Sequence, residues 1–263
     1  MCLLLALVGF DMPVRLGYFG AMSAILNASE LVVRYNTRAL LNGATLGIEE
    51  GGRVVERAYS ICSSPLEEEI EFFFELVRQG QLTPPLYLSK IGDTVLLRRQ
   101  AKGLFTLDRS ANHHRHFLVC TVTGVAPYVS MVRTFASEKA GEGPDVKLAL
   151  LHAASRSREF AYDRELEGFA RRHNWFQYIP TVSRPWEEPS WEGEVGRAED
   201  VLRKYLDSFG FEPSNTTVYL CGHPQMIENS KGILIRRSLA KESIRQEVYW
   251  VPKKEGVHLT QKS

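Results

Sequence analysis

The sequence lacks the features that would assign it to several large classes of protein. It has no apolar run long enough to span a bilayer, because residues 2–10 form only a short one, with no basic residue ahead of it. That run fits a buried strand or an irregular start better than a targeting signal. The 32 basic and 31 acidic residues leave a formal net charge of +1, which argues against nucleic-acid binding through global charge. There is no internal repeat.

Cysteine is scarce, and its spacing excludes the usual metal motifs. The four cysteines, at positions 2, 62, 120 and 221, never approach the spacing of zinc or iron–sulfur ligands. Three histidines within residues 113–116 have no distant cysteine or carboxylate cluster to complete a site, and we interpret them as part of a solvated linker. No metal is therefore expected. Reduced thiols are typical of a cytoplasmic protein, and a one-electron acceptor would have to be a separate protein.

The first part of the chain predicts β-structure. With 263 residues, 44% of them hydrophobic, the sequence is long enough for two modest domains with ample core. Short β-branched or aromatic runs at 31–35, 70–74 and 94–97 are separated by glycine-containing turns. No strong amphipathic helix interrupts them. We therefore predict an antiparallel β-barrel over residues 1–110.

After a polar connector at residues 110–116 the pattern changes to alternating strands and helices. Strands are predicted at 117–120, 146–151, 176–182, 217–221 and 247–251. Helices are predicted at 126–136, 159–172, 198–209 and 224–239. This alternation predicts an open parallel α/β sheet over residues 111–263, with ligands at the carboxyl ends of its strands.

Two short motifs point to redox chemistry. Arg57-Ala58-Tyr59-Ser60 offers a guanidinium suited to a pyrophosphate, a flat ring suited to an isoalloxazine and a hydroxyl suited to a flavin ring edge. Thr123-Gly124-Val125-Ala126-Pro127 suits a strand-to-helix turn whose backbone N–H groups can meet a dinucleotide phosphate. One chain with both motifs predicts an enzyme that moves hydride from a nicotinamide to a flavin.

These motifs, with two others, resemble the bacterial branch of the ferredoxin/flavodoxin–NADP reductase family. The matching segments are residues 57–65, the Gly-x-Leu-Thr turn at 80–83, residues 120–128, and Cys-Gly-x-Pro-x-Met at 221–226. The resemblance implies an FAD-binding barrel followed by an NADP-binding α/β domain. It also implies FAD and NADP(H) as cofactors, and hydride transfer between NADPH and FAD coupled to single-electron exchange with ferredoxin or flavodoxin.

On the flavin side, the resemblance assigns roles to individual residues. Arg57 would bind the FAD pyrophosphate, Tyr59 would stack on the isoalloxazine, and Ser60 would hydrogen-bond near the flavin N5. The other FAD contacts that the resemblance implies are Cys62, Ser63, Val77, Gly80, Leu82, Thr83 and Trp250. Trp250 belongs to a Glu-x-Tyr-Trp segment that starts at Glu247, and here the chain continues 13 residues beyond that segment's tryptophan, to Ser263. Core packing in a last strand is the alternative for these aromatic residues.

On the nicotinamide side, the resemblance places Cys221 beside the nicotinamide C4 and lets Glu247 assist proton delivery. With Tyr59 and Ser60 these form the predicted catalytic set, although Cys221 alone also fits a buried structural thiol. Arg184 and Arg197 resemble two positions that bind the 2′-phosphate of NADP, which favours NADPH over NADH. The remaining NADP contacts implied are Thr123, Gly124, Ala126, Pro127, Arg156, Gly222 and Met226. Relatives often have an arginine at position 155, where this chain has serine, and Arg156 or the nearby Arg158 could substitute for it.

One departure from the family pattern keeps alternatives open. Val122 occupies the first glycine position of the family's Thr-Gly-Thr-Gly motif, and added bulk there motivates a non-catalytic flavoprotein as an alternative. Another is the reductase component of an oxygenase or of a larger NAD(P)H-linked complex. We expect a monomer that docks a small acidic electron carrier. The candidate basic residues for docking are Arg98, Arg99, Lys102, Arg236, Arg237, Lys241 and Lys253.

Overall fold

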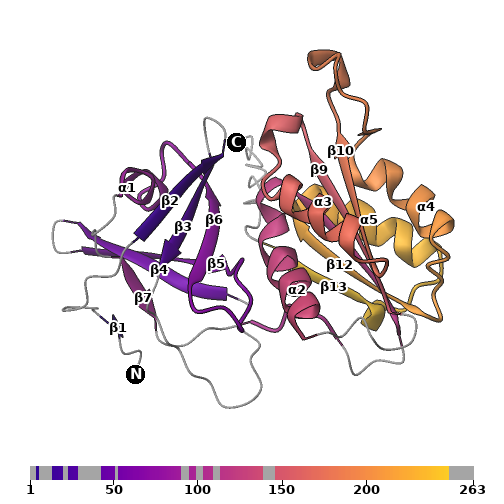
Figure 1. The fold of residues 1–263 in the computed structure, drawn as a ribbon, viewed down its shortest axis with the longest axis horizontal. Coiled ribbons are helices and arrows are strands. Elements are labelled where there is room, and N and C mark those ends of the chain that lie inside the picture. The colour runs from indigo at the N-terminus through magenta and orange to yellow at the C-terminus, as the bar shows by residue number, and fades with distance from the viewer. Residues whose placement is uncertain are drawn as a thin grey trace, which may run out of the picture.

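The structure, a computed structural model, places two units side by side (Figure 1). It describes residues 4–5, 14–19, 23–28, 43–50, 53–89, 95–98, 103–108, 113–138 and 146–248. The first unit, the β unit, is built from residues before 110, and the second, the α/β unit, from residues after 112. Among the described residues, no helix is long and apolar enough to cross a membrane.

The β unit contains two antiparallel sheets. The first has the order β1-β7-β4-β5, where the strands are β1 (Leu4–Leu5), β7 (Leu96–Arg98), β4 (Gly43–Glu50) and β5 (Arg53–Ser60). The second has the order β2-β3-β6, where the strands are β2 (Val14–Phe19), β3 (Ser23–Ala28) and β6 (Ile70–Glu75). An isolated antiparallel bridge between Ile61 and Phe72 joins the two sheets. The predicted antiparallel architecture is confirmed, while residues 31–35 lie outside the described part.

Strand β6 shows why this sequence forms a sheet with two buried faces. Side chains alternate between the faces of a strand. Accordingly Phe72 and Phe74 pack inside the β unit with Leu46, whereas Phe73 packs into the core of the α/β unit. The run of three phenylalanines therefore contributes side chains to the hydrophobic cores of both units.

A short helix in the β unit was not predicted. Helix α1 (Thr83–Leu88) begins with prolines in its first turn, and its Leu86 is fully buried in the core of the β unit. Proline fits that position because its missing N–H would have no partner within the helix. Six residues are too few to show a helical period in the sequence.

The α/β unit is a six-stranded parallel sheet with helices on both faces. The strand order is β11-β10-β9-β8-β12-β13. The strands are β8 (Arg115–Thr121), β9 (Lys147–Ala154), β10 (Phe176–Val182), β11 (Glu194–Val195), β12 (Thr216–Gly222) and β13 (Ile244–Val248). Because β9 lies on one side of β8 and β12 on the other, the chain changes direction across the sheet at the carboxyl end of β8. Ligands bind at such a point in open α/β sheets.

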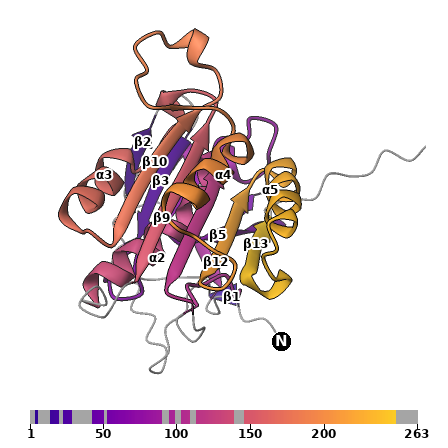
Figure 2. The same cartoon turned by 90° about the vertical axis from the view of Figure 1, so that its right-hand side faces the viewer.

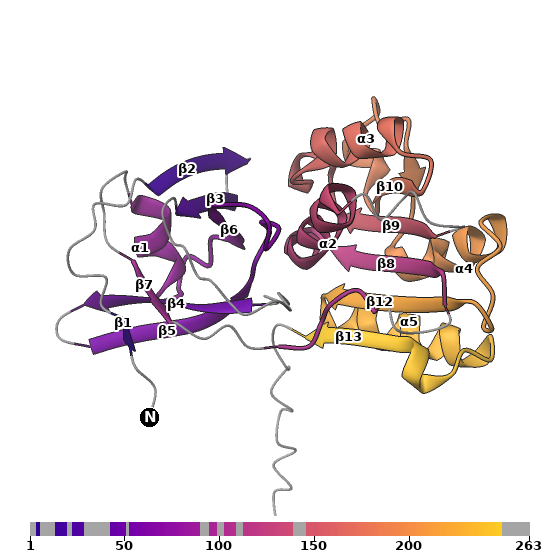
Figure 3. The same ribbon diagram turned by 60° about the horizontal axis from the view of Figure 1, so that its bottom comes forward.

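Two helices cover each face of this sheet. Helices α2 (Ala126–Ser137) and α3 (Asp163–Arg172) pack with one core cluster, and α4 (Ala198–Ser208) and α5 (Pro224–Arg236) with another. Figure 2 shows α4 and α5 on the side away from the β unit, and Figure 3 shows α2 next to it. The remaining short elements are the 3-10 turns η1 (Val122–Val125), η3 (Ser157–Glu159), η4 (Pro185–Glu187) and η5 (Lys241–Ser243).

Several details differ from the sequence predictions. The helix predicted from residue 159 starts at Asp163, because Tyr162 adopts a left-handed backbone with φ 63° that no helix can continue. The last strand starts at Ile244 rather than at residue 247, and residues 249–251 of the predicted strand lie outside the described part. His116 is not in a solvated linker: it lies in β8, is 3% exposed and approaches the Tyr219 hydroxyl at 3.3 Å.

The two units meet through hydrogen bonds between the turn after β5 and helix α2. Ser130 donates its hydroxyl to the Ser63 carbonyl at 2.7 Å, and the hydroxyls of Ser64 and Thr134 lie 2.9 Å apart. The Ser130 bond is buried, so it resists competition from solvent, and the Ser64–Thr134 contact is partly buried. The turn that follows the Arg57–Ser60 motif is therefore fixed against the α/β unit.

Candidate functional site

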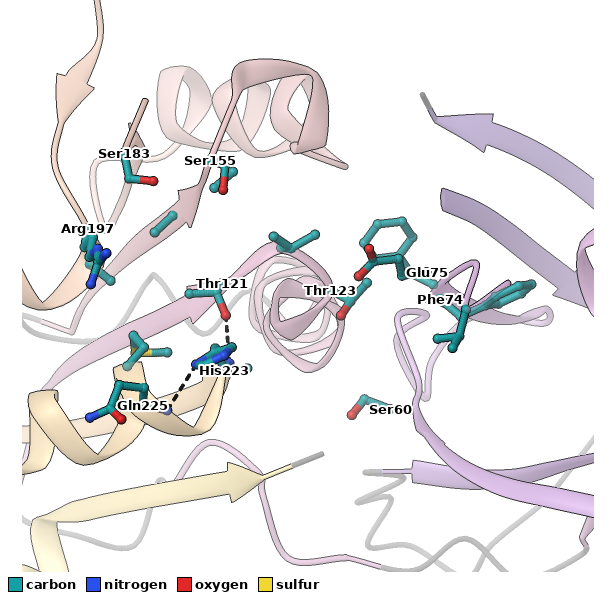
Figure 4. Close-up of a pocket in the computed structure, with 18 of the residues that line it drawn as sticks. Ser60, Phe74, Glu75, Thr121, Thr123, Ser155, Ser183, Arg197, His223 and Gln225 are labelled. Atoms are coloured by element: carbon teal, nitrogen blue, oxygen red, sulfur yellow. Dashed lines mark hydrogen bonds between the residues drawn. The ribbon is translucent and has the colours of Figure 1, made fainter. Parts of the chain in front are cut away.

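A cleft of about 970 Å³ lies between the two units (Figure 4). Its β-unit wall comes from residues 57–60, 73–75, 77 and 83, and its α/β-unit wall from residues at or just after the carboxyl ends of β8, β9, β10, β11 and β12. This volume lies at the upper end of the ~300–1,000 Å³ typical of small-molecule sites. The cleft thus joins the two motifs that the sequence singled out.

The β-unit wall carries the Arg-x-Tyr-Ser motif. Arg57 is exposed, and its guanidinium donates to the Glu56 carbonyl at 2.6 Å, which leaves other N–H groups of the side chain toward the cleft it lines. The half-buried Tyr59 ring packs edge-on against Phe74, with 6.0 Å between ring centroids. Burial raises the pKa of Tyr59, and the Arg57 charge opposes that rise. A neutral ring beside a cation suits an aromatic, negatively charged ligand.

The predicted catalytic residues Ser60, Cys221 and Glu247 come together in space. Ser60 donates its hydroxyl to Glu247 Oε2 at 3.2 Å, although 187 residues separate them in sequence. Glu247 on β13 pairs in register with Cys221 on β12, so the two side chains share a face of the sheet. Burial raises the pKa of Glu247, and the Ser60 hydrogen bond opposes it. This carboxyl can hold a proton at a higher pH than an ordinary glutamate.

The turn between β6 and α1 is closed by Thr83 and leaves little room for a side chain at Gly80. The Val77 backbone N–H donates to Thr83 Oγ1 at 2.9 Å, and Gly80 N–H donates to the Val77 carbonyl at 2.8 Å. A Cβ at Gly80 would lie 3.0 Å from that same carbonyl. Val77 and Thr83 line the cleft, so the two ends of this turn border the site.

On the α/β side, two glycines let the ends of β8 and β12 approach closely. A Cβ at Gly124 would lie 2.5 Å from the Cys221 carbonyl oxygen, and one at Gly222, where φ is 124°, would lie 2.3 Å from Thr121 Oγ1. Thr121 Oγ1 also accepts the His223 backbone N–H at 2.8 Å, a bond drawn in Figure 4. A Cβ at either position would collide with the neighbouring strand end, so both glycines are needed for this close approach at the switch point of the sheet.

Val122, the departure from the family glycine, also has a positive φ, of 43°. A β-branched residue rarely adopts this backbone. Its side chain packs against a small cluster that contains Ala154, Phe160 and Val182. Valine therefore keeps the backbone conformation that glycine favours, at a position that lines the cleft.

The arginines predicted for the 2′-phosphate separate into two groups. Arg184 and Arg197 line the cleft together with Ser155 and Ser183. Arg156 donates to Glu187 at 2.5 Å and to Glu159 at 3.3 Å, and it is not among the lining residues. Arg184 also donates to Glu187, at 3.4 Å, but it does line the cleft. The positive charge of Arg156 is already matched by two carboxylates.

The predicted residues do not all face the cleft. Lining residues among them are Arg57, Tyr59, Ser60, Val77, Thr83, Thr123, Arg184, Arg197, Gly222 and Met226. Cys62, Ser63, Gly80, Leu82, Gly124, Ala126, Pro127, Arg156, Cys221 and Glu247 are not lining residues, and Trp250 lies outside the described part. Cys221 is fully buried. The roles of both groups stay predictions.

The sequence did not single out several residues that line the site. The most prominent is Trp186, which is 72% exposed and follows Arg184 by two positions. A tryptophan in a loop next to a predicted phosphate-binding arginine is a signal that could have identified it. The others include Thr121, Glu75, Glu199, His223 and Gln225.

Comparison with known proteins supports the sequence motifs. Residues 118–232 match the family model described as an oxidoreductase NAD-binding domain. Ferredoxin–NADP reductase from Azotobacter vinelandii is 32% identical over 208 residues, which is 72% of this chain and 75% of the relative. Flavodoxin/ferredoxin–NADP reductase from Buchnera aphidicola subsp. Baizongia pistaciae is 27% identical over 214 residues, covering 77% and 83% of the two chains.

The fold matches solved structures over most of its length. A ferredoxin NADP+ reductase from Neisseria gonorrhoeae, solved with bound FAD and NADP, superimposes with a TM-score of 0.78. The match covers 91% of this chain and 98% of that one at 20% sequence identity. This similarity establishes the two-unit arrangement independently of the sequence motifs.

Proposed function

We propose a function from one established premise, which is that the chain belongs to the ferredoxin–NADP reductase family. The protein transfers hydride between NADPH and FAD, and exchanges single electrons with ferredoxin or flavodoxin. The observation that carries the proposal is the cleft, because it joins the Arg57–Ser60 wall to the closely packed ends of β8 and β12. When bound there, FAD supplies a centre that accepts a hydride and releases single electrons.

The β unit holds the flavin in this proposal. Arg57 pairs with the pyrophosphate, Tyr59 covers the ring system, and Phe74 fixes the angle of the tyrosine. Ser60 and Glu247 would hold a proton for the bound flavin, since the burial-raised pKa of Glu247 favours its protonated form. The carboxyl and hydroxyl thus form one hydrogen-bonded pair beside the reacting edge.

The α/β unit binds the nicotinamide coenzyme. The backbone around Thr121, Thr123 and Gly222 forms the near end of the binding site, where little room is left for side chains. Arg184 and Arg197 form the far end and pair with the 2′-phosphate. Because hydride transfer depends on alignment more than on acid–base groups, this rigid backbone edge is the main contribution of the unit.

Anaerobic titration of the purified protein tests the proposal. A yellow protein that is bleached rapidly by NADPH, and far more slowly by NADH, is expected. Replacing Arg184 and Arg197 by alanine should raise KM for NADPH while leaving KM for NADH nearly unchanged, since NADH has no 2′-phosphate. The matched control is Arg171→Ala, because Arg171 is exposed on α3 and does not line the cleft.

Re-oxidation of the reduced protein tests the electron partner. Reduced protein mixed with ferredoxin or flavodoxin should return to the oxidised spectrum with transfer of single electrons. A colourless protein that takes up no added FAD would overturn the proposal. A yellow protein that neither nucleotide bleaches would favour a non-catalytic flavoprotein instead.

A further inference from the structure

The strained residue Val122 is held by a fully buried histidine. His152, on β9, is 0% exposed, and its Nε2 lies 3.1 Å from the Val122 carbonyl oxygen. Its other ring nitrogen, Nδ1, lies 3.1 Å from the Tyr178 hydroxyl on β10. The ring also packs edge-on against Phe160 at 4.9 Å between centroids. Both ring nitrogens are therefore engaged, one of them with the cleft-lining loop.

The direction of each hydrogen bond follows from chemistry. A carbonyl oxygen only accepts, so Nε2 carries the proton and donates to Val122. Nδ1 then accepts from the Tyr178 hydroxyl, which is the one arrangement of a neutral ring that satisfies both contacts. Burial lowers the pKa of His152 to about 4, which keeps the ring neutral at neutral pH. The tyrosine fixes the tautomer, and the tautomer fixes the bond to the loop.

This bond sets the orientation of one peptide group at the edge of the cleft. In a trans peptide the C=O and the following N–H point in opposite directions. With the Val122 carbonyl directed at the buried ring, the Thr123 N–H is directed away from it. Rotation of this peptide would break the bond to His152 and move Val122 and Thr123, both of which line the cleft.

We propose that His152 is a positioning residue that holds the left-handed Val122 through its carbonyl, and so keeps the edge of the cleft shaped for the nicotinamide nucleotide. Glycine reaches a positive φ without a Cβ penalty, so a chain with the family glycine needs such support less. Here valine makes the loop depend on His152. The inference takes the identity of the nucleotide from the proposed function. The coupling between Val122 and His152 does not depend on that function.

A double-mutant cycle tests this dependence in the FAD-loaded protein. His152→Leu removes the donor and should weaken NADP+ binding, measured by calorimetry, about fivefold to tenfold, the value of roughly one net hydrogen bond. His152→Gln, whose amide can donate near the Nε2 position, should restore affinity to within about twofold. In a Val122→Gly background, His152→Leu should cost less than about twofold, because glycine keeps the backbone unaided.

A second buried histidine provides the control. His116 lies on β8, is 3% exposed and is also near a tyrosine hydroxyl, but it does not line the cleft. His116→Leu should lower stability as His152→Leu does, and yet leave NADP+ affinity unchanged. Long-range ¹H–¹⁵N NMR should show His152 neutral with the proton on Nε2.

Two results would overturn the inference. One is an equal loss of NADP+ affinity from His152→Leu in the parent protein and in the Val122→Gly variant, because additivity means no coupling. The other is a His152 ring with its proton on Nδ1. If the parent protein binds no NADP+, the proposed function fails, but the same cycle measured by thermal unfolding still tests the coupling between His152 and Val122. A smaller decrease of Tm from His152→Leu in the Val122→Gly background than in the parent protein supports the coupling, and an equal decrease refutes it.

Discussion

Removing the Arg133 guanidinium should strongly destabilise the contact between the two units. Arg133 on α2 donates to both oxygens of Glu165 on α3, at 2.6 and 2.8 Å, and lies 3.4 Å from both Glu71 and Glu67 of the β unit. Its side chain is only 15% exposed, and Tyr162 donates a further hydrogen bond to Glu71. One cation thus neutralises carboxylates from both units.

The size of the effect follows from the geometry. Breaking a buried ion pair by removing one partner costs about 3–5 kcal/mol, and partial exposure of Glu165 and Glu67 places Arg133→Met near the lower end, at about 3 kcal/mol. At ~2–4 °C per kcal/mol, Tm should fall by about 6–12 °C in thermal unfolding followed by circular dichroism. Arg171→Met is the matched control. It breaks the exposed pair with Glu167, which is worth less than about 0.5 kcal/mol.

The dependence on pH gives a second, independent check. Burial raises the pKa of Glu71, and Arg133 opposes the rise. Without Arg133 the folded-state pKa of Glu71 rises further above its unfolded value, so protonation favours the folded state as pH falls. The stability deficit of Arg133→Met should therefore shrink between pH 8 and 5. A deficit below about 1 kcal/mol, or one that is constant over this range, would refute the assigned role of Arg133.

Three further predictions concern the cleft. Ser60→Ala removes the hydroxyl that lowers the pKa of Glu247, so the pH profile of flavin reduction by NADPH should move to higher pH; an unmoved profile would argue against a role for the pair. Trp186→Ala removes an exposed ring that suits adenine stacking. Titration calorimetry should show that the affinities for NADPH and NADH both fall by about tenfold. A loss of affinity for NADPH alone would contradict stacking. Burial lowers the pKa of His152 from 6.5 to about 4 in the folded protein, so the unfolded chain takes up this proton first as the pH falls. The free energy of unfolding should therefore decrease by about 3 kcal/mol between pH 6.5 and pH 4. In urea unfolding, His152→Gln should be less sensitive to acid than the parent protein, and an equal sensitivity would contradict the assignment.

The order of elements in the α/β unit could be predicted because its segments are long and periodic. Strand β10 occupies the predicted residues 176–182, since apolar and β-branched residues fill the segment and polar turns bound it. The predicted last strand, 247–251, starts three residues after the observed start at Ile244, because the prediction relied on Val248 and the aromatic residues after it. The pairing of Ile244 with Val218 on β12 sets where β13 starts, and such pairing between distant segments leaves no local pattern.

The candidate site likewise has parts that the sequence could predict and parts that it could not. The Arg57–Ser60 motif could be located because one short segment carries a cation, a ring and a hydroxyl. The contact of Ser60 with Glu247 brings together residues from two units, and nothing in either segment specifies its partner. Motif positions alone also could not show that Arg156 is paired with Glu187, since ion pairs depend on which loops meet in space.

Arg156 and Val122 both show that a substitution in a motif has to be judged with its surroundings. Arg156 is matched by two carboxylates and does not line the cleft, whereas Arg184, which has one carboxylate partner at 3.4 Å, and Arg197 do line it. Arg184 and Arg197 therefore carry the preference for a 2′-phosphate in our proposal. Judged by its bulk alone, valine in place of glycine would suggest that the nucleotide-binding site has been lost. Its φ of 43° instead shows that the glycine-like backbone persists, and the bond from His152 supplies the support that the side chain makes necessary. A departure from the motif therefore favours loss of function only where no such compensating contact exists.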